Sequence, residues 1–208
     1  MAKLSIIGAG DLGEQIANLA LRNGYEIEGY FDDFMPIGTI RQGGIVKGRI
    51  EDIDNQIDIK SGGVIVAIGY KHFKERQAIF EKISGKINIA TIIDRTAIID
   101  ETVTIGEGSV IMPGVVLDKN VRIGKNVFVN ISSTIAHDSE VGSHSFIAPR
   151  VAVAGFTKIG KRSFIGINAT LIDNISLCDD IQIGGGTVVI NSVADKGTYV
   201  GIPARKIR

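Results

Sequence analysis

The chain has 208 residues, a length that suits one large domain or two small ones. Lys plus Arg and Asp plus Glu each total 23, and the resulting zero net charge argues against binding nucleic acid through clustered positive charge. The longest uncharged stretch, 181–194, is too short to cross a bilayer, and the single Cys178 excludes an internal disulfide. We therefore expect a cytoplasmic protein that binds neither nucleic acid nor a membrane.

The residue mix predicts a large β portion. The chain has 37 Ile and 26 Gly but only 7 Leu. Side chains branched at Cβ favour extended backbone, and many glycines indicate repeated tight turns.

The first ninety residues alternate between strand and helix patterns. A buried strand over 3–7 precedes a helix that ends near Gly24, and a second strand over 27–31 ends in Asp32-Asp33. A third strand over 64–68 ends at Gly69, and a helix over about 72–83 follows. This alternation predicts a small parallel sheet in an α/β, Rossmann-like domain over residues 1–90.

The turn after the first strand has the spacing of a nucleotide-binding loop. Gly8, Gly10 and Gly13 match GxGxxG between a strand and a helix, where unpaired N–H groups face a phosphate. Asp32 follows the second strand, where an acid accepts from a ribose hydroxyl or a base N–H. Because Gly10, Asp32 and Gly69 each follow a strand, we expect them to line one crevice. Glycines that only close tight turns are the simpler alternative, and the context favours the nucleotide site.

From residue 93 the sequence repeats every six residues. An aliphatic residue opens each of seventeen hexads, and Ala, Ser, Thr, Val or Ile stands four residues later. The aliphatic positions are Ile93, Ile99, Ile105, Ile111, Leu117, Ile123, Val129, Ile135, Val141, Ile147, Val153, Ile159, Ile165, Leu171, Leu177, Ile183 and Val189. This hexapeptide repeat is similar to that of left-handed parallel β-helices, with three hexads, about 18 residues, in each coil. We expect a β-helix over 91–194, a tail over 195–208 and, from the resemblance, a trimer.

One histidine stands at a corner beside an acid. His137 occupies the third hexad position, where side chains face outward, and Asp138 follows it. Such a pair can act as a general base, and a solvated corner is the alternative that the residues leave open. One coil further on lies Gly155, which would leave a groove for a ligand; the same spacing links Ile167 to Gly185. We expect His144 to be a solvated corner residue.

Motifs along nearly the whole chain resemble the bacterial nucleotide-sugar acetyltransferases, of the UDP-4-amino-sugar N-acetyltransferase and sialic acid O-acetyltransferase type. They are the glycine-rich turn, Tyr30-Phe31-Asp32-Asp33-Phe34, Ala67-Ile68-Gly69, Asn130-Ile131-Ser132-Ser133 before His137-Asp138, Ile183-Gly184-Gly185-Gly186, and Tyr199-Val200-Gly201-Ile202-Pro203-Ala204-Arg205.

The resemblance implies an acetyl-CoA-dependent N-acetyltransferase that acts on a nucleotide-linked amino sugar. His137 would be the general base and Asp138 its partner, in a homotrimer with active sites between subunits and no metal. Substrate would contact Gly10, Asp11, Leu12, Asp32, Asp33, Gly69 and Asn130. Acetyl-CoA would contact Phe146, Gly155, Ile167 and Gly185.

Two departures from the family pattern leave other functions open. The family places a second histidine where this chain has Phe146, and often Gly-His where this chain has Asp11-Leu12. The alternatives are an O-acetyltransferase acting on a sialic-acid-like sugar and a non-catalytic trimer that binds a nucleotide. A zinc enzyme of the carbonic-anhydrase type would need three histidines around the metal. It is disfavoured, because one of the three histidines of the chain, His72, lies outside the repeat.

Overall fold

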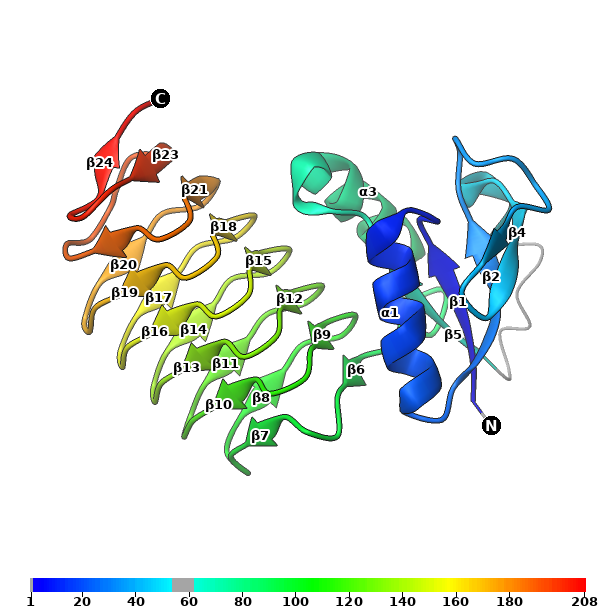
Figure 1. Cartoon of the computed structure of the whole chain (residues 1–208), viewed down its shortest axis with the longest axis horizontal. Coiled ribbons are helices and arrows are strands. Elements are labelled where there is room, and N and C mark those ends of the chain that lie inside the picture. Colours follow the sequence, from blue (N-terminus) through cyan, green and yellow to red (C-terminus); the bar gives the residue numbers. More distant parts are fainter. Residues whose placement is uncertain (1, 54–61) are drawn as a thin grey trace. The chain divides into compact units, whose positions relative to one another are not determined.

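The computed structural model describes residues 2–53 and 62–208. The chain divides into two compact units, Met1–Ile92 and Ile93–Arg208, whose elements are labelled in Figure 1. Within the described ranges, no helix combines the length and the apolar character needed to cross a bilayer.

The first unit contains a five-stranded sheet in the order β3-β4-β2-β1-β5. The strands are β1 Lys3–Ile7, β2 Glu26–Phe31, β3 Ile40–Arg41, β4 Gly44–Gly48 and β5 Gly62–Val66. The helices are α1 Asp11–Arg22, η1 Ile50–Asp52, η2 Tyr70–His72 and α3 Phe73–Ile83. β1 pairs in parallel with β2 and β5, so the carboxyl ends of these three strands lie at one edge of the sheet.

The predicted βαβ arrangement is confirmed, with two differences. β5 begins two residues earlier than predicted, because Gly63 pairs with Leu4. In the sequence, this glycine resembles a turn residue. A Cβ on Gly63 would lie 3.1 Å from the side chain of Ala90, so the strand is tightly covered there. The sequence reasoning also missed the β3–β4 hairpin, whose outer strand is antiparallel and only two residues long. The sheet is therefore mixed rather than fully parallel.

The second unit is a left-handed β-helix in which each hexad contributes one short strand. These strands are β6 Ile92–Ile93, β7 Ile98–Ile99, β8 Thr104–Ile105, β9 Val110–Ile111, β10 Val116–Leu117, β11 Arg122–Ile123, β12 Phe128–Val129, β13 Thr134–Ile135, β14 Glu140–Val141, β15 Phe146–Ile147, β16 Ala152–Val153, β17 Lys158–Ile159, β18 Phe164–Ile165, β19 Thr170–Leu171, β20 Ser176–Leu177, β21 Ile181–Ile183 and β22 Val188–Val189. Every predicted aliphatic position closes a strand, so the predicted register is confirmed.

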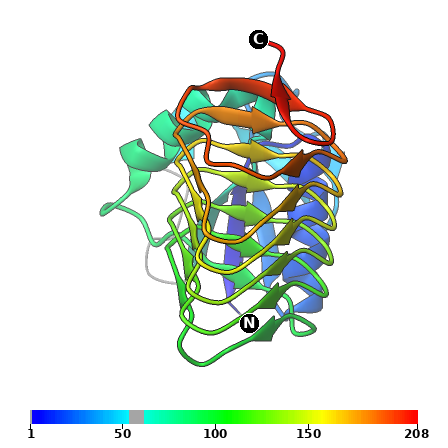
Figure 2. The same ribbon diagram turned by 90° about the vertical axis from the view of Figure 1, so that its left-hand side faces the viewer.

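Three faces and three corners follow from this register. Each strand from β6 to β19 pairs with the strand three further along, as Ile135 does with Val153, and Figure 2 shows the coils lying one above another. The first face contains β6, β9, β12, β15, β18 and β21; the second contains β7, β10, β13, β16, β19 and β22; the third contains β8, β11, β14, β17 and β20. The inward aliphatic side chains form one continuous core.

The corners share a backbone conformation that the sequence analysis did not predict. The fourth residue of every hexad from Gly108 to Gly186 has a positive φ, including Arg150 (58°) and Phe156 (57°). From Asn126 onward its N–H donates to a carbonyl of the preceding coil, as Asp138 N does to Lys119 O at 2.9 Å. The N–H groups of Gly114 and Asn120 donate instead to a threonine Oγ1 of the preceding coil. This contact explains why residues other than glycine and asparagine adopt the left-handed conformation here.

A ladder of buried hydroxyls supports these corners from inside. Ser133 Oγ donates to Ala148 O at 2.9 Å and accepts the Val151 N–H at 3.2 Å. Ser139 and Ser145 repeat this double contact one after the other. The tail then forms β23 Gly197–Val200, parallel to β21, and β24 Arg205–Lys206, antiparallel to β23.

Candidate active site

The His137–Asp138 pair lies at the corner between the second and third faces, which we call the second corner. His137 Nδ1 lies 3.1 Å from Asp138 Oδ2. The imidazole is about half exposed, because the third hexad position points outward from the coil. An exposed imidazole whose Nδ1 faces a carboxylate presents Nε2 to a substrate, which is the geometry of a general base.

The carboxylate of Asp138 has a second partner in the preceding coil. Asn120 Nδ2 donates to Asp138 Oδ1 at 2.9 Å. The hydrogen bond from Asn120, followed by that from His137, lowers the pKa of Asp138 below its usual value. Asp138 is therefore ionised throughout the neutral range and can balance the charge of a protonated imidazole. The sequence analysis missed Asn120, although adding one coil to 120 reaches 138.

Gly155 and Phe156 surround the imidazole from the following coil. A Cβ on Gly155 would lie 2.7 Å from His137 Cε1 and 2.8 Å from Nε2, so the ring itself fills the space that we expected to be an open groove. Phe156 meets the imidazole edge to face, with ring centroids 5.1 Å apart. Its own ring is half exposed. The missing side chain of Gly155 thus leaves room for the His137 imidazole. The predicted contact of Gly155 with acetyl-CoA stays a prediction.

Ile167 and Gly185 lie at a different corner, between the first and second faces, which we call the first corner. Ile167 is half exposed, and a Cβ on Gly185 would lie 3.0 Å from Ile167 Cγ2. Asn130 lies next to the same corner, where its Oδ1 accepts the N–H of Ile131 at 2.8 Å. The first and second corners are opposite edges of the second face, so one chain does not bring Ile167 and His137 together around a small group.

The third corner, between the third and first faces, contains His144. The prediction of a solvated His144 is wrong, because its side chain is only 6% exposed and Nδ1 lies 3.1 Å from Asn126 Nδ2. Phe146 stacks between Phe128 and Phe164, at centroid distances of 4.8 Å and 6.0 Å. The position of the family's second histidine is therefore part of an aromatic stack in this chain.

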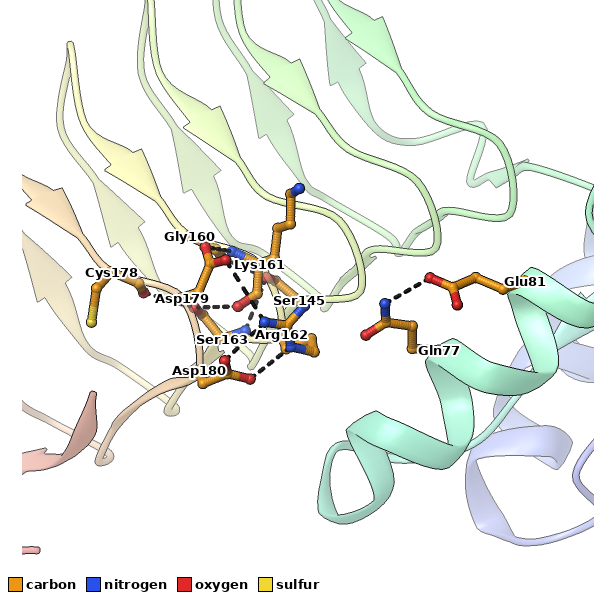
Figure 3. A network of polar contacts seen from close by, with 10 residues as sticks. All are labelled: Gln77, Glu81, Ser145, Gly160, Lys161, Arg162, Ser163, Cys178, Asp179 and Asp180. Atoms are coloured by element: carbon orange, nitrogen blue, oxygen red, sulfur yellow. Dashed lines mark hydrogen bonds and ion pairs between the residues drawn. The ribbon is translucent and has the colours of Figure 1, made fainter. Parts of the chain in front are cut away.

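The same third corner also holds a charged network. Arg162 binds Asp180 through two hydrogen bonds, Nε to Oδ1 at 2.7 Å and Nη2 to Oδ2 at 2.8 Å (Figure 3). Lys161 N donates to Asp179 Oδ1 at 2.8 Å. These contacts join adjacent coils and are structural.

Cys178 is not an activated thiol. Burial raises its pKa, and the nearby Asp179 raises it further. Across residues 2–53 and 62–208, no cluster of His, Cys, Asp or Glu side chains has an arrangement that could hold a metal ion.

In the first unit, the glycine-rich turn has the packing that the motif predicts. Gly8 has φ 104°, and a Cβ there would lie 2.7 Å from Ala67 O. A Cβ on Gly13 would collide with the carbonyl oxygen of Gly8, so α1 approaches β1 closely. Gly10 caps α1 with open space around it, and Asp11 and Leu12 form the first turn of the helix. A ligand can therefore approach the backbone at Gly10.

Asp32 holds this turn together. Its Oδ2 accepts Ala9 N–H at 2.8 Å, and its Oδ1 accepts the N–H groups of Phe34 and Met35, both at 2.9 Å. Partial burial would raise the pKa of Asp32, but these three hydrogen bonds outweigh it and lower the pKa. The carboxylate thus has a structural role, and its predicted contact with a nucleotide stays a prediction.

Asp33 and Gly69 lie at the same edge of the sheet. Asp33 Oδ1 accepts Ile50 N–H at 3.0 Å, and Gly69 caps η2 with open space around it. Because β1, β2 and β5 end together, the structure brings Gly10, Asp32 and Gly69 to one edge of the sheet. That they line one crevice stays a prediction.

Comparisons with known proteins agree with both units. The family model described as the GMPPB C-terminal domain matches residues 93–199, about half of the chain, and the PglD N-terminal domain model matches residues 3–83. A comparison with curated proteins gives no match.

Several solved structures match over their full length. The acetyltransferase domain of PglB from Neisseria gonorrhoeae FA1090, in complex with acetyl coenzyme A, has 29% identity and a TM-score of 0.92, with 99% of each chain covered. PerB from Caulobacter crescentus, in complex with CoA and GDP-perosamine, has 23% identity and a TM-score of 0.90, covering 100% of this chain and 98% of that chain. WeeI from Acinetobacter baumannii AYE has 24% identity and a TM-score of 0.73, with both chains fully covered. The last two show a shared fold.

Proposed function

The chain belongs to the nucleotide-sugar acetyltransferases of the hexapeptide-repeat family, and its repeats match the GMPPB C-terminal domain model. We propose that it moves an acetyl group from acetyl-CoA to the amino group of a nucleotide-linked amino sugar. The observation that carries this proposal is the half-exposed His137 imidazole, whose Nδ1 faces the Asp138 carboxylate. The acetyl-CoA complex of the PglB domain supports acetyl-CoA as the donor.

The proposed mechanism is a direct transfer. His137 Nε2 removes a proton from the sugar amine as the nitrogen attacks the thioester carbonyl. Asp138, ionised at neutral pH, stabilises the imidazolium that forms. The tetrahedral intermediate collapses, the carbon–sulfur bond breaks, and the CoA thiolate leaves. The raised pKa of Cys178 argues against a covalent acyl-enzyme on this residue.

We place the acetyl-CoA site between subunits of a homotrimer. The outward residues of the second face are uncharged from β13 onward, namely Thr134, Ala136, Ala152, Ala154, Thr170, Ile172, Val188 and Ile190. The third face carries Arg122, Glu140 and Lys158 instead. A face of uncharged, mostly apolar side chains suits packing against another copy. Threefold packing through the second face would bring Ile167 and Gly185 at the first corner of one protomer to His137 at the second corner of the next, with Gly155 as a further donor contact. The predicted contact of Phe146 with acetyl-CoA stays a prediction.

The acceptor would be held by the first unit. Gly10, Asp11 and Leu12 offer free backbone at a helix N-terminus, which suits a diphosphate. Asp32, Asp33 and Gly69 lie at the same edge of the sheet, and we assign them to the nucleotide sugar. The predicted contact of Asn130 with the substrate stays a prediction. Because the cell's acetyl-CoA and nucleotide sugars are cytoplasmic, we place the protein there, with no role for a membrane or nucleic acid.

Thiol release from acetyl-CoA tests the proposal. It would be measured against a panel of nucleotide 4-amino sugars and free sialic acids, for the wild type and for His137→Ala. The matched control is Glu101→Ala, at the same hexad position two coils away. We expect release with one amino sugar and a loss of at least about a hundredfold in His137→Ala alone. Thiol release only with sialic acids would contradict N-acetylation and favour O-acetylation. Binding of acetyl-CoA without thiol release for any acceptor would favour a non-catalytic trimer.

A further inference from the structure

A chain of hydrogen bonds runs along the second corner and ends at the imidazole of His137. Asp100 Oδ1 accepts the hydroxyl of Thr102 at 2.6 Å. Thr102 Oγ1 in turn accepts the backbone N–H of Asn120 at 2.7 Å, and Asn120 Nδ2 donates to Asp138. Because successive corners are one coil apart, Thr102, Asn120 and Asp138 form a column of fourth hexad positions.

Asn120 is held at both ends. Its backbone has φ 59°, a conformation that asparagine tolerates better than most residues, and its N–H is bound to Thr102. Its side-chain amide must donate to Asp138, because an ionised carboxylate only accepts. The two oxygens of Asp138 are thus divided between two donors, Oδ1 for Asn120 and Oδ2 for His137.

We propose that Asn120 is a positioning residue that fixes the Asp138 carboxylate so that Oδ2 faces His137 Nδ1. This inference rests on the proposed role of His137 as the base. Asp138 is a corner residue near the surface, and without Asn120 its carboxylate can rotate away from the imidazole. The imidazole proton would then no longer be held on Nδ1, and Nε2 would be the proton acceptor for only part of the time.

Three variants separate this role from a structural one. Asn120→Gly removes the amide without backbone strain, because Gly108, Gly114 and Gly186 hold the same corner position with positive φ. Asn120→Asp keeps the shape but replaces the donor with an acceptor. Asn174→Gly is the matched control: Asn174 has the same hexad position in the same column and φ 57°, but donates to Asp173.

The first readout needs no substrate. The ¹⁵N chemical shifts of His137 report which imidazole nitrogen carries the proton. We expect Nδ1–H in the wild type and in Asn174→Gly, and a shift toward Nε2–H in Asn120→Gly and Asn120→Asp. An unchanged tautomer in both Asn120 variants would overturn the proposal.

The second readout is kinetic. For Asn120→Gly we expect kcat to fall about tenfold, with little change in the KM of acetyl-CoA or of the nucleotide sugar. A tenfold loss is a part of the rate enhancement that a positioned general base contributes. Asn120→Asp should be impaired at least as much, and wild-type kcat in that variant would refute the donor role. An equal loss in Asn174→Gly would mean that the corner, and not the contact, matters. If the wild type transfers acetyl to no acceptor while the tautomer still shifts, the proposed function fails and the positioning of the imidazole stands.

Discussion

Replacing Gly155 with alanine tests whether the place of the imidazole decides the rate. The new Cβ would lie 2.7 Å from His137 Cε1, whereas ordinary contact begins at 3.4 Å, so the ring must move by about 0.7 Å. Displacements of about 1 Å at a reacting centre can cost about a hundredfold. We therefore expect kcat/KM to fall between about 10- and 100-fold in Gly155→Ala.

The same substitution should not weaken the fold. The φ of Gly155 lies outside the left-handed region, and the atoms nearest to the new Cβ belong to the exposed end of the His137 side chain. Restricting the unfolded chain should stabilise the protein by about 0.4–1 kcal/mol, less the cost of moving the ring. The melting temperature of Gly155→Ala should therefore stay at or slightly above that of the wild type.

A double-mutant cycle with His137→Ala gives the decisive assay. Once the imidazole is gone, adding the Gly155→Ala substitution should leave the residual rate unchanged, so the two losses should be strongly non-additive. Wild-type kcat/KM in Gly155→Ala would refute the reasoning. A rise of the acetyl-CoA KM in both backgrounds would instead place Gly155 against the donor.

Three further predictions concern other contacts. Phe156→Asn should raise the melting temperature, because it relieves strain of about 1 kcal/mol at a positive φ, while lowering kcat/KM about threefold through the lost contact with His137. Asp32→Asn should destabilise the protein by about 1–2 kcal/mol at pH 7 in thermal unfolding. Because the folded pKa of Asp32 is lowered, the stabilisation is present above its usual value and lost as the pH falls through the folded value, so wild type and variant should converge in acid. Ser133→Ala should cost about 1–3 kcal/mol in denaturant unfolding, since it leaves the Val151 N–H without its acceptor, and the exposed Ser176→Ala should cost almost nothing.

The sequence predicted the β-helix almost completely because its register depends on one physical requirement. An inward aliphatic residue must recur wherever the chain re-enters the core, and this happens every six residues from Ile99 to Val189. In the first unit, Gly8 and Gly13 predicted the turn because close packing there excludes a Cβ. The β3–β4 hairpin has no such pattern, since Ile40 is exposed and β3 has only two residues.

The site was harder to predict because its contacts join residues one coil apart. The 18-residue relation linked His137 to Gly155, but the sequence could not show that the imidazole itself takes the vacant space. Applied to the fourth hexad position, the same relation would have found Asn120 beside Asp138. The positive φ of Phe156 had no local signal, because the corner geometry imposes it; the glycines and asparagines at equivalent positions were the available clue.

The corner columns of the β-helix also limit how an active site can evolve on it. Adjacent coils are separated by the spacing of paired strands, about 4.8 Å, so groups in one column can be moved along the axis only in whole steps of that size. A smaller change in the position of a group must come from the length of a side chain or from the absence of one. Asn120, whose side chain contacts Asp138, is an example of the first, and Gly155, which lacks a Cβ beside His137, of the second. The position of a functional group along the β-helix is therefore fixed to the nearest coil, and a single substitution can adjust it only by less than the spacing between coils.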